Sequence, residues 1–231
     1  MKVGAIIQAR MNSSRLPGKV LLDLNGKSVL ERVVDRVSCS KMIDEIVVAT
    51  SSSLNDTKIS KFCKSRKISY IKGSEHDVLS RFYNAAKLFK ITNIIRITAD
   101  CPMIDYTIID KADEIFASKE FDYVSNVDER SFPDGLDVEV FTYSALEKSM
   151  KLANEPFHRE HVTTYIRGVS GYSKGEFKKF CLKNPEDLSH IRWTLDTKKD
   201  YYHIKKFFEE LEDNFSWLDA LKLEKKINHN E

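Results

Sequence analysis

Short apolar runs alternate with amphipathic segments through the first 126 residues, and this alternation limits the possible folds more than any other feature. Val3–Gln8, Glu45–Thr50 and Asn93–Thr98 are short and rich in branched aliphatic residues, as is typical of strands buried on both faces of a sheet. Helical periodicity lies between them: one helix is expected to begin at Ser28, and another to cover Asp77–Phe89. Strands and helices that alternate over short connections predict an α/β fold, with a doubly wound, mainly parallel sheet and helices on both faces.

The pattern becomes less regular after about residue 126. The other elements that periodicity predicts are helices at 56–65, 107–118, 144–153, 160–168 and 200–211, and strands at 68–71, 122–125, 137–143, 176–182 and 190–195. The charged residues 222–231 are expected to fray. We therefore predict a single domain over 1–231, with a core at about 1–126 and 183–220 and a smaller, irregular lobe at about 127–182.

Charge and cysteine content exclude several classes of protein. The 37 basic and 35 acidic residues leave a net charge of +2, which is too even for a general nucleic-acid or membrane-surface protein, so any anion site must be local. None of the four cysteines has zinc-like spacing, and we expect reduced thiols. The sequence shows neither a secretory signal nor a membrane span, which together predict a cytoplasmic protein.

Three cations lie within ten residues directly after the first strand. Arg10, Arg15 and Lys19 alternate with small residues, of which Ala9 is the first. A polyphosphate needs such fixed backbone donors, side-chain charges and little steric bulk, and ligands collect at the carboxyl ends of buried parallel strands. The loop has neither the GxxxxGK[ST] nor the GxGxxG pattern. It is a candidate triphosphate site, and a solvated basic turn is the alternative.

Two aspartates follow strand-like runs elsewhere in the chain. Asp100 comes just after Asn93–Thr98, and Asp196 just after an apolar run at 190–195. Magnesium takes one or two carboxylates in proteins and lets phosphate oxygens and water complete its shell. The pair is therefore a candidate Mg²⁺ site, although each aspartate alone could instead cap a turn or a helix.

Several blocks of sequence resemble one enzyme family. The loop Arg10–Lys19, with Val20–Lys27 after it, resembles the opening of the ulosonic- and acylneuraminic-acid cytidylyltransferases, and more closely that of the SpsF-like branch named for spore-coat polysaccharide synthesis. Further blocks follow in order over nearly the whole chain: Val47–Ser51, Gly73–Tyr83, Arg96–Pro102, Phe132–Glu139, Arg159–Thr163 and Arg192–Asp196. The loop itself differs from the glycine-rich form of the neuraminate enzymes, and Thr98–Asp100 stands where the Kdo cytidylyltransferases have Gln-Gly-Asp.

The resemblance implies a Rossmann-like nucleotidyltransferase fold, usually a homodimer, in which a sugar oxygen attacks the α-phosphorus of CTP and expels pyrophosphate, in surface polysaccharide biosynthesis. The core would bind the nucleotide, and the lobe would bind the sugar and form the dimer. By position, the resemblance gives as catalytic residues Arg10, Lys19, Asp100 and Asp196. It gives as nucleotide-binding residues Ala9, Arg10, Arg15, Lys19, Thr50, Ser51, Ser74, Arg81 and Asp100. Asp100 and Asp196 would be the Mg²⁺ ligands.

An acidic sugar or a sugar phosphate would need cations in the lobe. The candidate acceptor-binding residues there are Arg130, Asp134, Asp137, Glu139, Arg159 and His161. His161 is also open to interpretation as a surface or interface residue. The three acidic residues are expected to alternate on one face of a strand, where they could equally form a solvated edge.

Alternatives to this function remain open at the level of sequence. The acceptor could be an ulosonic acid or, with another nucleoside triphosphate, a sugar 1-phosphate, which needs no general base. A metal-dependent nucleotide-sugar glycosyltransferase is a second class, but its donors are diphosphates and need fewer cations. A non-catalytic nucleotide-binding module is a third.

Overall fold

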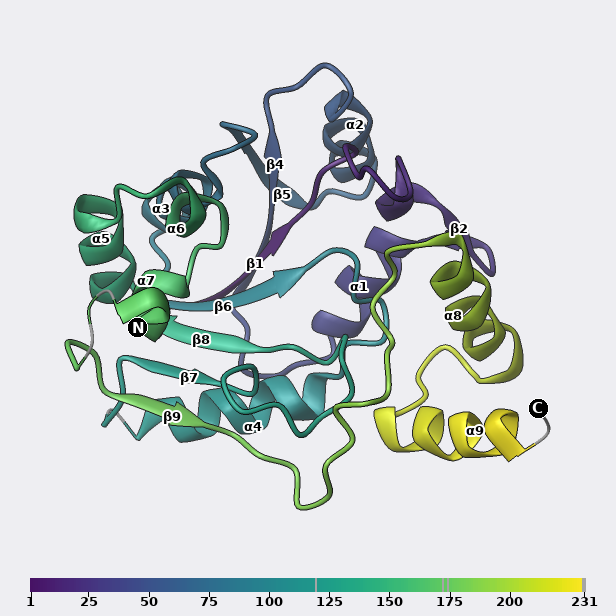
Figure 1. Cartoon of the computed structure of the whole chain (residues 1–231). Helices are drawn as coiled ribbons and strands as arrows, with labels where there is room; N and C mark the ends of the chain where they lie inside the picture. Colours follow the sequence, from purple (N-terminus) through teal and green to yellow (C-terminus); the bar gives the residue numbers. More distant parts are fainter. Residues whose placement is uncertain (119, 172, 174, 230–231) are drawn as a thin grey trace.

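The computed structural model describes residues 1–118, 120–171, 173 and 175–229, and a seven-stranded sheet runs through its centre (Figure 1). The strands of this sheet are β1 (Val3–Gln8), β4 (Glu45–Ser51), β5 (Ser69–Gly73), β6 (Asn93–Thr98), β7 (Tyr123–Ser125), β8 (Glu139–Thr142) and β9 (Lys179–Cys181). Their order in space is β5-β4-β1-β6-β8-β7-β9. Only β8 runs antiparallel to its neighbours, so the predicted mainly parallel sheet is confirmed.

Helices cover both faces of the sheet, as predicted. They are α1 (Val29–Val37), α2 (Thr57–Ser65), α3 (Val78–Phe89), α4 (Tyr106–Ala117), α5 (Tyr143–Leu152), α6 (Pro156–Glu160), α7 (Thr164–Arg167), α8 (Lys198–Glu210) and α9 (Trp217–His229), with short 3₁₀ turns at Lys19–Leu21 and Val169–Gly171. A two-stranded ribbon, β2 (Asp23–Leu24) with β3 (Lys27–Ser28), leads into α1.

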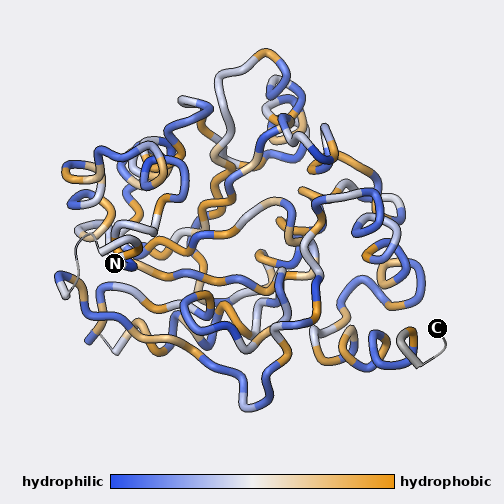
Figure 2. Tube along the Cα trace, in the orientation of Figure 1, coloured by the Kyte–Doolittle hydropathy of each residue, from blue (hydrophilic) through white to orange (hydrophobic). Residues whose placement is uncertain are grey.

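Two apolar cores, one on each face, hold the layers together, because successive strand residues point to opposite faces. Ile7 and Ile95 belong to the core under α1, α2, α4, α8 and α9. Ile6 and Ile94 belong to the other core, under α3, α5 and α7. Figure 2 shows the hydrophobic stretches along the inner strands and the hydrophilic residues on the loops and outer helices. In the described residues, no helix combines the length and the apolar character that crossing a bilayer requires.

The segment at 127–182, which we predicted to be an irregular lobe of a single domain, shares the sheet of the core. It contributes β8, which pairs with β6 and β7, and β9, which pairs with β7. Its helices α5, α6 and α7 lie together with α3 at one side of the molecule (Figure 1). The lobe is therefore an outgrowth of the same sheet.

The segment 190–195 forms no regular strand, which corrects our prediction. Its alternation is real, because Ile191, Trp193 and Leu195 are all buried. However, its backbone pairs with loops: Trp193 N donates to the carbonyl of Asp134 at 2.6 Å, and Leu195 N to that of Asp100 at 2.8 Å. A single isolated bridge, between Asp134 and Arg192, is its only ladder contact in the described residues.

The C-terminal segment is also better ordered than predicted. Residues 222–229 belong to α9, which the sequence led us to describe as a fraying tail, while 230–231 lie outside the described residues. The indole N–H of Trp193 donates to the carboxylate of Glu224 at 2.9 Å, and both side chains are buried. This bond, together with the buried Leu221 and Leu223, holds α9 against the body of the protein.

The helix predicted at 160–168 is two short helices, α6 and α7, with a break between them. At the break, Val162 has a φ of 52°, a region that a β-branched residue rarely adopts and that costs about 1–3 kcal/mol. Its side chain is fully buried. The strain must therefore be offset by the contacts of the neighbouring residues.

Asp113 on α4 should make the stability of the protein depend on pH. Its side chain is buried, and its Oδ1 finds no hydrogen-bond donor in the described residues. Burial, together with the nearby Asp110, Asp44 and Glu114, raises its pKa to about 6. The folded state therefore holds a proton that the unfolded state releases at lower pH, so this contribution to stability is lost as the pH rises from about 4 to about 6.

Substituting Asp113→Asn should remove about 2 kcal/mol of the fall in unfolding free energy between pH 4.5 and pH 8. Urea unfolding at the two pH values measures it. The exposed Glu114 on the same helix provides the matched control, and Glu114→Gln should leave most of the pH dependence in place. Equal slopes for Asp113→Asn and the wild type would contradict the assignment.

Candidate active site

A cavity of about 360 Å³ lies where the loop after β1 faces the end of β6. Ligands of open α/β sheets bind at this edge, beyond the carboxyl ends of the strands. Its lining residues are Gln8, Ala9, Arg10, Asn12, Ser13, Ser14, Arg15, Lys19, Val20, Val78, Arg81, Thr98, Ala99, Asp100, Glu160, His161 and Asp196. The loop, both predicted metal ligands and His161 therefore share one cavity.

Asp56, which sequence reasoning missed, fixes the start of the loop. Asp56 stands at the N-cap of α2, but its side chain makes no capping bond. Its carboxylate instead accepts the backbone N–H of Met11 at 2.7 Å, while its second oxygen accepts from Ser51 N at 3.1 Å and from the Thr50 hydroxyl at 3.2 Å. Asp56 is only 1% exposed, and its carboxylate links the loop to the end of β4. The Asn-Asp turn before α2 was the available signal.

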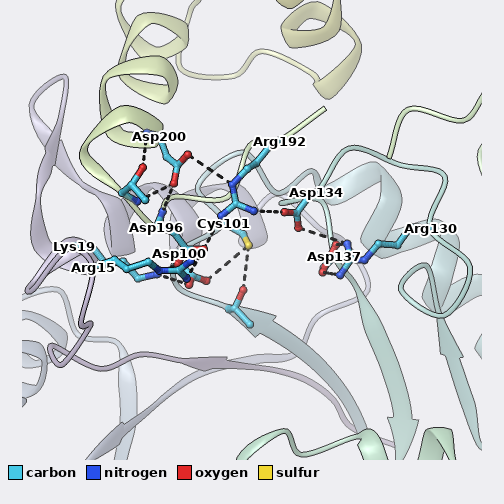
Figure 3. A network of polar contacts seen from close by, with 12 residues as sticks. Arg15, Lys19, Asp100, Cys101, Arg130, Asp134, Asp137, Arg192, Asp196 and Asp200 are labelled. Atoms are coloured by element: carbon cyan, nitrogen blue, oxygen red, sulfur yellow. Dashed lines mark hydrogen bonds and ion pairs between the residues drawn. The ribbon is translucent and has the colours of Figure 1, made fainter. Parts of the chain in front are cut away.

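The ammonium group of Lys19 lies between the two predicted metal ligands. Its Nζ donates to Asp100 Oδ2 at 2.6 Å and to Asp196 Oδ1 at 2.8 Å. Figure 3 shows these side chains meeting from separate parts of the chain. The two carboxylates converge because Leu195 N bonds the carbonyl of Asp100, which holds the segment before Asp196 beside the end of β6.

This arrangement fixes the charge of the site. Burial lowers the pKa of Lys19, but the attraction of Asp100 and Asp196 outweighs it, and the net pKa is raised. Burial raises the pKa of Asp196, but Lys19, Arg15 and Arg192 outweigh it, and its pKa falls below the usual value. The ammonium and the carboxylate are therefore both charged at neutral pH.

Asp196 is also the meeting point of two guanidinium groups. Arg15 Nη2 lies 2.9 Å from its Oδ2, and Arg192 Nη2 lies 2.6 Å from the same oxygen. Arg15 is the more exposed of the two, so it can turn toward a bound anion. Arg192 was not predicted as a site residue, although it lies four residues before Asp196, within the block that carries the family resemblance.

The ion-pair network continues through Arg192 to the predicted acceptor residues. Arg192 Nη1 donates to Asp134 at 2.8 Å, and Arg130 donates to both oxygens of Asp137 at 2.8 and 2.7 Å (Figure 3). These three acceptor candidates form a charged group beside the cavity and are absent from its described lining. Asp134 and Asp137 precede β8, so the expected alternation on one strand face is wrong.

Gly135 explains why this network is so close to the site. Its φ is 114°, and a Cβ there would lie 2.7 Å from the carbonyl carbon of Trp193. Only glycine allows the two backbones to approach this closely. The close approach places Asp134 beside Arg192.

The donor set suits a magnesium ion. One oxygen of Asp100 and one of Asp196 both lie within 2.8 Å of Lys19 Nζ. A single cation can therefore contact two carboxylate oxygens at this point. Mg²⁺ accepts one or two carboxylates plus phosphate oxygens and water. Among the described residues, no group of three or more His, Cys, Asp or Glu side chains is placed to hold a metal alone. A metal at Asp100 and Asp196 would therefore be completed by substrate oxygens.

The four residues predicted to contact the base and ribose differ in whether they line the cavity. Thr50 and Ser51 are fully buried against Asp56, and in the described structure they do not line the cavity. Ser74 caps the turn before α3, where its hydroxyl accepts the N–H of Asp77. Arg81 lines the cavity, and its Nη1 donates to the carbonyls of Ser74 at 2.6 Å and Glu75 at 3.1 Å. Of the four, Arg81 alone reaches the cavity.

Two acceptor candidates from the lobe have structural partners instead. Arg159 donates to the carbonyl of Met150 at 3.0 Å and pairs with the carboxylate of Asp77, so it ties α6 to α5 and α3. Glu139 is 2% exposed and pairs with Arg96 inside the sheet. Neither lines the cavity described above, because each is occupied by a partner distant in sequence.

His161 and its neighbour Glu160 form the wall of the cavity on the lobe side. Glu160 was missed by sequence reasoning, although it lies in the block Arg159–Thr163. Its carboxylate lies 3.8 Å from the guanidinium of Arg10, which places a loop cation opposite the lobe. The cavity thus has one wall rich in cations and carboxylates, and another formed by the end of α6.

Comparison with known proteins gives this geometry its context. Residues 4–227 match the family described as Cytidylyltransferase. The chain is 42% identical to the uncharacterised protein MJ1063 of Methanocaldococcus jannaschii, over 95% of this chain and 87% of the relative. It is 34% identical to the spore coat polysaccharide biosynthesis protein SpsF of Bacillus subtilis, over 89% and 85%. It is 28% identical to the 8-amino-3,8-dideoxy-manno-octulosonate cytidylyltransferase of Shewanella frigidimarina, over 83% and 84%.

Solved structures share the same fold. A cytidylyltransferase from Leptospira borgpetersenii superposes with a TM-score of 0.93 at 35% identity, over 99% of this chain and 96% of that one. A CMP:2-keto-3-deoxy-manno-octonic acid synthetase solved in complex with CTP superposes with a TM-score of 0.67 at 18% identity, over 91% and 100%. The nucleotidyltransferase fold and the resemblance to SpsF-like and ulosonic-acid enzymes are thereby confirmed. From the match over nearly its whole length and from these relatives, this chain belongs to the cytidylyltransferase family.

Proposed function

We propose that the protein transfers CMP from CTP to an ulosonic acid or a related sugar, with release of pyrophosphate, as a step of surface polysaccharide synthesis. The observation that supports it most is the single point at which Lys19, Asp100 and Asp196 meet, beside the cations of the loop. A nucleotidyl transfer needs positive charge on the triphosphate and a divalent ion beside the α-phosphorus.

The cations of the chain would hold the triphosphate. Lys19 pairs with Asp100 and Asp196, and Arg15 pairs with Asp196. Phosphate oxygens would offer each cation a further anionic partner within the same cavity. Arg10 approaches from the other side of the loop, at the edge that faces Glu160. At an effective dielectric constant near 20, one such cation about 4 Å from a phosphate charge gains roughly 4 kcal/mol before desolvation is counted. Arg81 would contact the nucleotide from the end of the cavity at α3.

Asp100 and Asp196 would hold Mg²⁺. An ion held there would neutralise the charge that develops on the departing pyrophosphate and would polarise the α-phosphate. The acceptor hydroxyl is then oriented by the wall of the cavity at Glu160 and His161, where a sugar can approach from the lobe. Trp193 and Leu195, which precede Asp196, are buried and would shield that side of the site from water.

A matrix of acceptors and nucleotides tests the proposal. The purified chain is incubated with Mg²⁺, each of the four nucleoside triphosphates, and a panel of ulosonic acids and sugar 1-phosphates, while pyrophosphate is measured. CTP with an ulosonic acid should give the fastest release. Thermal melting under the same conditions should show CTP as the most stabilising nucleotide, because a ligand at 100 times its Kd adds about 2.7 kcal/mol to stability.

Other outcomes identify the alternatives. Release only with another nucleotide and a sugar 1-phosphate would indicate a sugar-phosphate nucleotidyltransferase. Free nucleoside diphosphate from a nucleotide sugar would indicate a glycosyltransferase. A protein that binds none of the four triphosphates with Mg²⁺ present would refute nucleotidyl transfer.

A further inference from the structure

A buried polar network crosses the sheet beneath the cavity and joins its two walls. At its centre the carboxylate of Glu139, on β8, accepts the hydroxyl of Tyr123 at 2.6 Å and that of Thr163 at 2.5 Å, both at Oε1. Its other oxygen pairs with Arg96 on β6. Glu139, Tyr123 and Thr163 are buried, and the side chain of Arg96 is 16% exposed.

One end of the network reaches the cavity through β1. Arg96 Nε donates to the side-chain oxygen of Gln8 at 3.3 Å, and Gln8 lines the cavity at the start of the cationic loop. Attraction between Arg96 and Glu139 outweighs the burial of each: the pKa of Arg96 is raised and that of Glu139 is lowered. The pair is therefore charged and fixed in place.

The other end reaches the cavity through the break between α6 and α7. Thr163 N donates to the carbonyl of His161 at 2.5 Å, which closes a three-residue turn around Val162. A positive φ at the centre of such a turn is its rare and strained form, and here the central residue is β-branched. Glu160 and His161, directly before this turn, are the residues that face the cavity.

We propose that Thr163 is a positioning residue for the sugar acceptor: its bond to Glu139 holds the strained turn at Val162, and the turn aims His161 and Glu160 into the cavity. The inference rests on the proposed function for the identity of the ligand that this wall meets. A backbone turn that is strained at Val162 and anchored by the buried hydroxyl of Thr163 is well suited to hold one orientation of the residues before it. Glu139 thus acts through Thr163 and touches no substrate.

Matched substitutions separate this role from a general loss of buried hydrogen bonds. Thr163→Val keeps the shape of the side chain and removes the hydroxyl. Thr163→Ser keeps the hydroxyl. Tyr123→Phe removes a bond of similar length to the same oxygen of Glu139 from the sheet side, where both donors are fully buried.

The first measurement is amide hydrogen exchange along 156–167 with CTP and Mg²⁺ present. Thr163→Val should speed exchange at residues 160–164 at least tenfold, and Thr163→Ser and Tyr123→Phe should stay within twofold of the wild type. Faster exchange spread evenly over the whole chain in Thr163→Val would overturn the proposal, as would unchanged exchange at 160–164.

The second measurement is steady-state pyrophosphate release with 3-deoxy-manno-octulosonate as the acceptor probe. Thr163→Val should raise the acceptor KM about tenfold while the KM for CTP stays within twofold, and Thr163→Ser should restore both. Equal effects of Thr163→Val and Tyr123→Phe on the acceptor KM would overturn the proposal. If the wild type releases no pyrophosphate with any acceptor, the proposed function fails, and the exchange experiment still decides whether Thr163 holds the turn.

Discussion

Replacing Asp196 with asparagine is expected to lower the turnover number for pyrophosphate release about a thousandfold. In the described residues, Lys19 pairs with two carboxylates, those of Asp100 and Asp196, so the loss of Asp196 would halve the protein's ligands at the proposed metal site. Metal-borne charge stabilisation supplies several kcal/mol of a phosphoryl-transfer barrier, and each 1.36 kcal/mol changes the rate about tenfold. Turnover of Asp196→Asn with CTP and the best acceptor, at saturating Mg²⁺, measures the effect.

Asp213 offers a matched control for this substitution. It also binds two cations, Arg32 at 2.6 Å and Lys27 at 3.1 Å, but it lies outside the cavity. Asp213→Asn should keep turnover within about threefold of the wild type, because partly exposed ion pairs contribute little. Titration of Mn²⁺ in the presence of CTP should show weaker metal binding for Asp196→Asn alone. Full activity of Asp196→Asn would remove the metal site from the proposal.

Replacing Lys19 with methionine should destabilise the protein by about 3 kcal/mol at neutral pH when metal is chelated. The side chain of Lys19 is only 9% exposed and pairs with both Asp100 and Asp196. Its removal takes this cation from Asp100, while Asp196 keeps Arg15 and Arg192, and a buried charge that loses its partner is costly. Because a divalent cation would bind the same two carboxylates, adding Mg²⁺ without nucleotide should restore much of the lost free energy of unfolding. The same variant should lose nearly all turnover, because the proposed triphosphate site would lose the most buried of the three loop cations.

Lys27 gives the comparison for this second experiment. It also lies between two carboxylates, Asp35 at 2.8 Å and Asp213 at 3.1 Å, but on the surface. Lys27→Met should change the unfolding free energy by less than about 1 kcal/mol, with no dependence on Mg²⁺. Urea unfolding of Lys19→Met and Lys27→Met, each with EDTA and then with Mg²⁺, gives the four unfolding free energies to compare. A Lys19→Met protein whose stability ignores Mg²⁺ would argue against metal binding by this pair.

Much of the fold follows from local signals in the sequence. β1 and β6 have the predicted ends, since apolar runs of that length fit a strand buried on both faces. Ser28 was predicted to start a helix, and its hydroxyl accepts the N–H of Glu31 at the start of α1. The segment 190–195 shows the limit of this reasoning. Alternation predicts which residues are buried, but the backbone partners of the segment lie in distant loops.

For the site, too, the sequence indicated individual residues but not their partners. Asp100 and Asp196 both follow strand-like runs, and the resemblance indicated both, while their shared contact with Lys19 needed coordinates. Arg159 and Glu139 were assigned to the acceptor because charged residues in a substrate lobe suggest binding. Their partners, Asp77 and Arg96, are far away in sequence. No local pattern could distinguish a buried ion pair from a ligand contact.

The strand order has a consequence for synthesis on the ribosome. β8 lies between β6 and β7, although it is made after both. While the nascent chain ends before residue 139, β6 therefore keeps an open edge and β7 has no ladder neighbour, which is the condition under which strands pair with the wrong chain. Arg96 lies on that open edge and pairs with Glu139 once β8 has been made, which closes the edge of β6. The other edge of β7 stays open until β9 pairs with it.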